Sequence, residues 1–152
     1  MKMPAKFTGF IILLVSLPFC SISVQARSVP IYPPIQDVIE MGKTKKKLRD
    51  DVQLYFSDQP HPAIETTLRQ GFVVHKKASK VDRTDEEACH IAMLEILRVF
   101  QARAHRAGGN AVVNIESYYK KKSFRSEDQY ECFTGYAKSG VILRGDIIKL
   151  EE

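Results

Sequence analysis

The chain lacks tryptophan, has only three cysteines in 152 residues, and has no internal repeat or long low-complexity segment. Its apolar run at residues 7–19 is about thirteen residues long, whereas a membrane-spanning helix needs about twenty. A polytopic membrane protein is therefore excluded. The length corresponds to one domain, which also excludes a large multidomain motor.

Sequence signatures of catalysis and metal binding are also missing. There is no glycine-rich loop ending in Lys-Ser or Lys-Thr, no Gly-x-Ser-x-Gly, no Cys-x-x-Cys and no His-x-x-x-His. His90 follows Cys89, but neighbouring side chains on a helix diverge by about 100°. We therefore expect no catalytic residue, no metal site, no cofactor and no ATP. The four histidines are His61, His75, His90 and His105.

The N-terminal residues resemble an export signal. Met1–Lys6 carries two lysines and no acid, residues 7–19 are mostly apolar, and Val24 and Ala26 fit the small-residue positions before a cleavage site. This pattern predicts a signal peptide over residues 1–26 that is cleaved after Ala26. The mature protein is then periplasmic or secreted and has no transmembrane span.

Two alternatives to cleavage after Ala26 stay open. One is an uncleaved anchor, and the other is a lipoprotein acylated at Cys20, although Phe19 is bulkier than the residue expected before such a cysteine. Cleavage also lowers the charge. The chain has 23 basic and 18 acidic residues, a net charge of +5, and loss of Lys2 and Lys6 leaves 21 basic residues and a net charge of +3.

The mature chain would keep two cysteines, Cys89 and Cys132. An even number of cysteines in an oxidising compartment indicates a disulfide bond. The alternative is two buried free thiols.

The mature chain divides into an arm and one domain. Residues 27–50 are first proline-rich and then basic, which predicts an N-terminal arm, and residues 51–152 form a single α+β domain. Within the arm, residues 35–41 are long enough for two helical turns. Strands are expected at 52–56, 68–77, 110–119, within 129–143, and at 147–150.

The strongest local signal predicts a helix over residues 85–107. Thr84 and Glu87 have the spacing of a capping box, and Gly108 suits the left-handed residue that ends a helix. Apolar side chains recur at helical spacing in between. Because strands lie on both sides of this segment, we expect an α+β fold in which one long helix packs on a mainly antiparallel sheet.

Two polar segments are candidates for a binding surface. His61 stands between two prolines that would hold it at the surface, and residues 118–122 mix aromatic and basic side chains. The ordinary alternatives are a turn residue and a solvated strand end. The candidate binding residues are His61, Tyr118, Tyr119, Lys120, Lys121 and Lys122.

Several motifs resemble a known group of proteins. They are Asp51-Val-Gln-Leu-Tyr-Phe56, Gln59-Pro-His-Pro62, Asp85-Glu-Glu-Ala-Cys89, Gly108-Gly-Asn-Ala-Val-Val-Asn-Ile-Glu-Ser-Tyr-Tyr119 and Gly145-Asp-Ile-Ile-Lys-Leu150. Over residues 50–150 the chain resembles small exported bacterial proteins that carry the product name "excinuclease ATPase subunit". Its helix-to-strand half is more distantly similar to YbjQ-like domains and to the outer-membrane lipoprotein sensor of the Rcs envelope-stress pathway. That sensor protein is cross-linked by disulfide bonds. The resemblance implies a role in the bacterial envelope.

Three functions are consistent with these features. The first is an exported, non-catalytic domain that binds another envelope component, a protein or a polymer, in sensing or assembly. The second is an exported enzyme with a loop-built site around His61, which requires a concave pocket that joins His61 to Tyr119. The third is weak binding of an anionic polymer. The small net charge, with Glu127 and Asp128 near the basic run, argues against nucleic acid.

Overall fold

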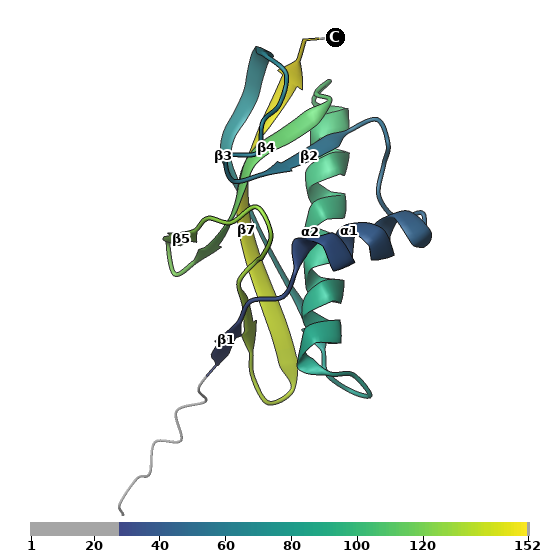
Figure 1. Cartoon of the computed structure of the whole chain (residues 1–152), viewed down its shortest axis with the longest axis vertical. Coiled ribbons are helices and arrows are strands. Elements are labelled where there is room, and N and C mark those ends of the chain that lie inside the picture. The colour runs from purple at the N-terminus through teal and green to yellow at the C-terminus, as the bar shows by residue number, and fades with distance from the viewer. Residues whose placement is uncertain (1–27, 152) are drawn as a thin grey trace, which may run out of the picture.

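The computed structural model describes residues 28–151, so the expected signal peptide and Cys20 lie outside the described residues. Strands predominate, and two helices lie on the same side of a curled sheet (Figure 1). In chain order the elements are β1 (Val29–Ile31), α1 (Ile35–Thr44), β2 (Gln53–Phe56), β3 (Ile64–Ser79), α2 (Asp85–Arg106), β4 (Ala111–Tyr119), β5 (Lys122–Phe124), β6 (Cys132–Thr134) and β7 (Lys138–Leu150).

The seven strands form one sheet with the order β1-β6-β7-β4-β2, in which β3 also pairs with β7 and β5 with β4. β7 pairs antiparallel with β3 over its whole length, from Ser79 opposite Lys138 to Ile64 opposite Leu150. Its other edge pairs antiparallel with β6 and then with β4. β2 pairs parallel with β4 and forms one end of the sheet.

The expected architecture of a single long helix on a mainly antiparallel sheet is wrong. The described chain is 43% strand and 26% helix, has two helices rather than one, and curls its sheet into a half-barrel. The error has two physical causes. Prolines and lysines suggested an arm where β1 and α1 form, and the sequence predicted separate strands within 129–143 and at 147–150, whereas β7 runs unbroken from Lys138 to Leu150.

The glycines of β7 permit close packing instead of ending the strand. A Cβ at Gly145 would lie 3.0 Å from the side chain of Val112, and one at Gly140 would lie 3.2 Å from that of Lys77. Glycine in a strand often marks such a close approach. β7 therefore continues through both positions.

The segment 29–44 belongs to the packed structure. β1 pairs with β6, and α1 begins after Pro34, whose φ of −71° suits the residue before a helix. Ile35 and Val38 are buried in the same core cluster as α2 and the sheet. The N-terminal segment thereby closes one side of the core.

Helix α2 has the terminal features that the sequence predicts. The hydroxyl of Thr84 accepts a hydrogen bond from the Glu87 amide, and the Glu87 carboxylate accepts one from the Thr84 amide at 2.8 Å. This bonding also lowers the pKa of Glu87. Gly108 follows the helix with a φ of +78°, a conformation that glycine adopts without strain. The buried face of α2 packs against β3 and β7.

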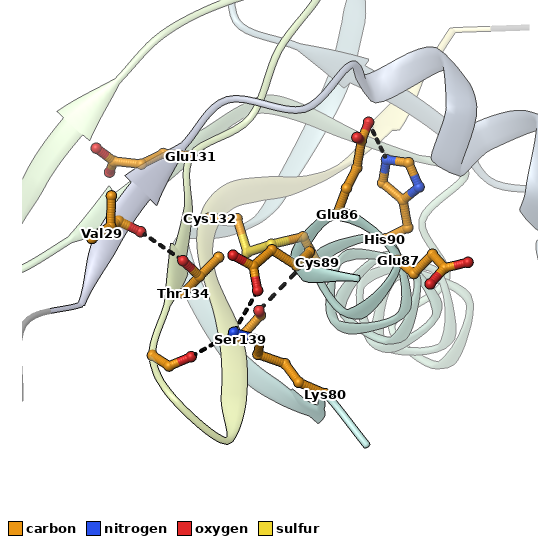
Figure 2. The surroundings of a disulfide bond; sticks show 12 residues. Val29, Lys80, Glu86, Glu87, Cys89, His90, Glu131, Cys132, Thr134 and Ser139 are labelled. Atoms are coloured by element: carbon orange, nitrogen blue, oxygen red, sulfur yellow. Dashed lines mark hydrogen bonds and ion pairs between the residues drawn. A yellow bond between two sulfur atoms is a disulfide. The ribbon is translucent and has the colours of Figure 1, made fainter. Parts of the chain in front are cut away.

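Cys89 and Cys132 form the expected disulfide bond. It joins the first turn of α2 to β6, with 6.0 Å between the two Cα atoms (Figure 2). Both residues are fully buried. The bond closes a loop between positions 43 residues apart and fixes the start of α2 against the sheet.

We predict that replacing both cysteines with alanine lowers the free energy of unfolding by about 4 kcal/mol, the chain-entropy value for a loop of this size. Urea unfolding of the double variant and of reduced wild-type protein measures the loss, and the two should agree. A loss below about 1 kcal/mol would contradict the constraint that we assign to this bond.

Candidate binding groove between α1 and β2

A groove of about 650 Å³ lies between α1 and β2. Ile35 and Ile39 of α1 form part of one wall, and Leu54 and Phe56 of β2 form part of the other. Gln101 of α2 contributes to the lining between them. The groove is thus built from segments that lie far apart in the sequence.

The groove runs beside the open edge of the sheet. β2 is the last strand of the sheet path, and β4 is its only partner strand among residues 28–151. The Gln53 amide donates to the Asn110 carbonyl at 2.8 Å, and the Ser57 amide donates to the Ile115 carbonyl at 2.9 Å. In a parallel pair, alternate residues direct their main-chain groups to the partner strand.

This alternation leaves Leu54 and Phe56 with main-chain groups that face away from β4. The Phe56 amide donates to the side chain of Gln59 at 2.8 Å, as expected for a group on the outer edge. For Leu54, no such side-chain partner is found among the described residues. By this alternation its N–H and C=O lie on the open edge of β2, and Leu54 is one of the residues that line the groove.

Gln101 fixes the segment that borders the groove. The side chain is almost fully buried at 2% exposure, and its oxygen accepts from the Arg49 amide at 2.8 Å. Its amide nitrogen donates to the carbonyls of Arg49 at 2.9 Å and Val52 at 2.7 Å. One side chain thereby satisfies three main-chain groups just before β2.

The groove carries charges of both signs. Lys43 and Arg49 contribute basic groups to its lining, whereas Asp50, Glu127 and Asp128 contribute acids. Arg49 also forms hydrogen bonds with Asp51, and this pairing lowers the pKa of the Asp51 carboxyl. A ligand of uniform charge is therefore poorly matched to this groove.

A second cavity of about 320 Å³ lies at the aromatic and basic segment that the sequence singled out. Tyr119 stacks on Phe133 with 3.5 Å between ring centroids, and both line the cavity with Lys77 and Lys138. His75 also lines this cavity. Burial first, and then the charge of Lys77, lower the pKa of His75 and favour its neutral form.

His61 lies beside Tyr55 of β2. The ring of His61 lies 5.5 Å from that of Tyr55, and its Nδ1 is 2.7 Å from the Pro62 carbonyl oxygen. His61 lines neither the groove nor the second cavity, whereas Tyr119 lines the second. Neither of these two cavities therefore joins the residues that the enzyme alternative requires.

The basic residues beside Tyr119 occupy a tight turn. Lys120 and Lys121 connect β4 to β5 with positive φ angles of 50° and 62°, and Lys122 begins β5. The ammonium of Lys120 lies 5.3 Å from the Tyr119 ring centroid, within cation–π range. Tyr118 instead lies under the guanidinium of Arg144 at 4.1 Å.

A buried carboxylate holds the other end of this hairpin. The side chain of Glu116 is 3% exposed and accepts hydrogen bonds from Arg125 at 2.9 Å, from Ser123 at 3.0 Å and from Arg144. Arg125 also pairs with Asp58 at 2.7 Å. Because Glu116 is fully engaged with cations and a hydroxyl, it has a structural role rather than that of a free acid or base.

Three possible metal ligands come together at the junction of α1 and α2. Asp37, Glu86 and His90 place one ligand atom each within 4.8 Å of the others. The sequence predicts no metal site, although the four-residue spacing of Glu86 and His90 places those two on one helix face. Asp37 lies on α1, so its closeness to Glu86 and His90 is visible only in the folded structure.

No helix in residues 28–151 has the length and hydropathy needed to cross a membrane. The chain matches no protein-family model, and neither the curated proteins nor the solved structures include a significant match to it.

We predict that Gln101→Met destabilises the protein by about 2–4 kcal/mol, because methionine fills a similar volume but leaves the buried carbonyl of Val52 and two partly buried main-chain groups of Arg49 without partners. Urea unfolding measures the loss, and hydrogen exchange should show faster exchange at the Arg49 amide. An unchanged Arg49 amide would contradict the role assigned to Gln101. The exposed Arg98→Gln on the same helix is the control.

Proposed function

We propose that the protein is an exported, non-catalytic binding domain that holds an extended segment of a partner protein in the groove between α1 and β2. The observation that carries this proposal is a groove of about 650 Å³ that is lined by Leu54 of β2, the strand at the open edge of the sheet. An extended segment would add to the sheet beside β2 and bond to these groups.

The walls of the groove suit such a segment. Side chains on a strand alternate between its two faces, so a bound segment would direct every second side chain toward apolar residues such as Ile39 and Phe56. Main-chain hydrogen bonds supply affinity, and the side-chain pockets supply specificity. The mixed charges of the rim favour a polypeptide over a polyanion.

Two further features support this function. The disulfide bond between Cys89 and Cys132 is typical of proteins in oxidising compartments, as expected for an exported protein with a signal peptide cleaved after Ala26. The resemblance to exported envelope proteins and to a sensor lipoprotein points to a partner in the bacterial envelope. Neither the groove nor the second cavity joins His61 to Tyr119, as the enzyme alternative requires.

A second candidate function rests on the cavity beside Tyr119. The stacked rings of Tyr119 and Phe133, with Lys77, Lys120 and Lys138 around them, combine flat apolar surface with positive charge. Such a surface suits a short stretch of an anionic polymer such as an acidic glycan. It lies outside the groove, so the two functions are separable.

The groove is tested with peptides selected from a random displayed library on the oxidised protein. We expect selected peptides to protect the Leu54 amide from exchange, and Leu54→Pro to weaken them at least tenfold (about 1.4 kcal/mol), because proline removes the outward N–H but not the bonds to β4. Ile39→Ser should weaken them through lost apolar contact. Isothermal titration measures each affinity.

The exposed Tyr136→Ser is the matched control and should bind like wild type. Thermal unfolding establishes that each variant is folded. Peptides that bind Leu54→Pro and Ile39→Ser as tightly as wild type would show that the groove is not the binding site.

The second candidate predicts that heparin oligosaccharides bind with an affinity that falls steeply as salt is raised. Lys138→Gln should reduce the slope of log affinity against log salt by roughly one, whereas Lys43→Gln in the groove should leave it unchanged. Titration at several salt concentrations gives the slope. Affinity that does not depend on salt would remove this candidate.

A further inference from the structure

The cluster of Asp37, Glu86 and His90 lies where the first turns of two helices meet. Glu86 and His90 stand one turn apart on α2, and the His90 Nε2 is 3.8 Å from the Glu86 carboxylate. Asp37 reaches the same point from the first turn of α1. Figure 2 shows the Glu86 carboxylate directed toward the His90 ring, close to the disulfide bond.

Helix electrostatics account for only part of this arrangement. An acid in the first turn of a helix is favoured by the helix dipole, which explains both Glu86 on α2 and Asp37 on α1. The dipoles do not explain why the two carboxylates, which repel each other, lie together beside the His90 ring. Among residues 28–151 the Asp37 side chain has no hydrogen-bond or ion-pair partner that would hold it there.

Two buried polar atoms beside the carboxylates make no hydrogen bond within residues 28–151, although the His90 Nε2 faces Glu86 at 3.8 Å. Within the described chain, the Nε2 of His90 and the hydroxyl of Tyr130 are inaccessible and make no hydrogen bond. Tyr130 is 1% exposed, and its ring centroid lies 6.3 Å from that of His90. Buried polar groups are normally satisfied, so both atoms point to a ligand at this position.

Tyr130 packs beside His90, and its hydroxyl is buried. A phenol hydroxyl can donate a hydrogen bond. It suits a group that supports a metal ligand or a bound water, as second-layer donors do in known metal sites.

We propose that Asp37, Glu86 and His90 form a binding site for a divalent transition-metal ion of the Zn²⁺ class. One imidazole nitrogen and two carboxylates are ligands that Zn²⁺ accepts, whereas Mg²⁺ and Ca²⁺ prefer oxygen ligands alone. Three protein ligands leave one tetrahedral position for water. The Tyr130 hydroxyl donates to that water or to a ligating carboxylate.

The geometry requires only small movements. Ligands about 2.0–2.2 Å from a zinc ion lie about 3.4 Å apart in a tetrahedron, and the three atoms already lie within 4.8 Å of one another. Asp37 and Glu86 are exposed and are free to close this difference by changes of side-chain torsion. Their exposure also gives the ion access from solvent.

The bound ion would join α1 to α2. α1 has no side-chain hydrogen bond at its N-cap, Pro34, and it forms a wall of the groove. An ion held by Asp37 and by two residues of α2 therefore fixes the start of α1 beside the disulfide bond. The metal site does not depend on the proposed ligand of the groove.

The test uses oxidised, tag-free protein that has been stripped of metal with a chelator and then titrated calorimetrically with zinc chloride. We expect one Zn²⁺ per chain, with slower hydrogen exchange in α1 after binding. Asp37→Asn, Glu86→Gln and His90→Gln should each weaken binding by at least tenfold. Magnesium and calcium chlorides should bind much more weakly than zinc.

Glu40→Gln on α1 and His105→Gln on α2 are the matched controls and should bind zinc like wild type. Tyr130→Phe should weaken zinc binding less than the ligand variants do, and should not lower the stability of the metal-free protein. Zinc binding that survives His90→Gln or Asp37→Asn would overturn the site, as would the absence of stoichiometric binding. Loss of metal-free stability in Tyr130→Phe would indicate a water in place of the ion and would also overturn it.

Discussion

The alternation of side chains along β7 is the constraint on which the rest of the structure depends. Its residues alternate between buried and partly exposed from Ser139 to Ile147, and the alternation changes phase where Ile147 and Ile148 are both buried. The same strand pairs with β3, β4 and β6, so a one-residue shift of β7 would turn apolar residues such as Leu143 out of the core. The register of β7 thereby places the other strands, and β6 brings Cys132 to α2.

Local signals predicted the parts of this fold that local chemistry determines. The capping box at Thr84 and the left-handed Gly108 fixed the ends of α2, because both act within one helical turn. The predicted architecture was wrong where tertiary contacts, and not local sequence, determine the structure. α1 is held by burial of Ile35 and Val38 and not by a strong local signal, and β7 passes through glycines that neighbouring strands require. Composition alone indicated an arm where α1 forms and separate strands where β7 is continuous.

The candidate sites show the same division. Residues 118–122 were recognised because aromatic and basic side chains are adjacent in the sequence, and Tyr119 does border a cavity. The groove gave no such signal, since it combines α1, β2 and Gln101 from distant positions, and its main feature is the unpaired main chain of Leu54. Side-chain patterns do not report which strand becomes an edge. The sequence indicates His61 as a candidate binding residue because of its flanking prolines, which restrict the backbone but do not by themselves form a pocket.

The disulfide, the acidic cluster and the groove are linked through the placement of α1. The disulfide holds the first turn of α2 against β6, and that turn carries Glu86 and His90. α1 crosses this fixed point and continues along the groove, so its position sets the distance between the groove wall and β2. A short helix without a side-chain cap gains little stability by itself, and its order comes from packing and from groups that bind it. A group that fixes the start of α1 therefore also fixes the width of the groove.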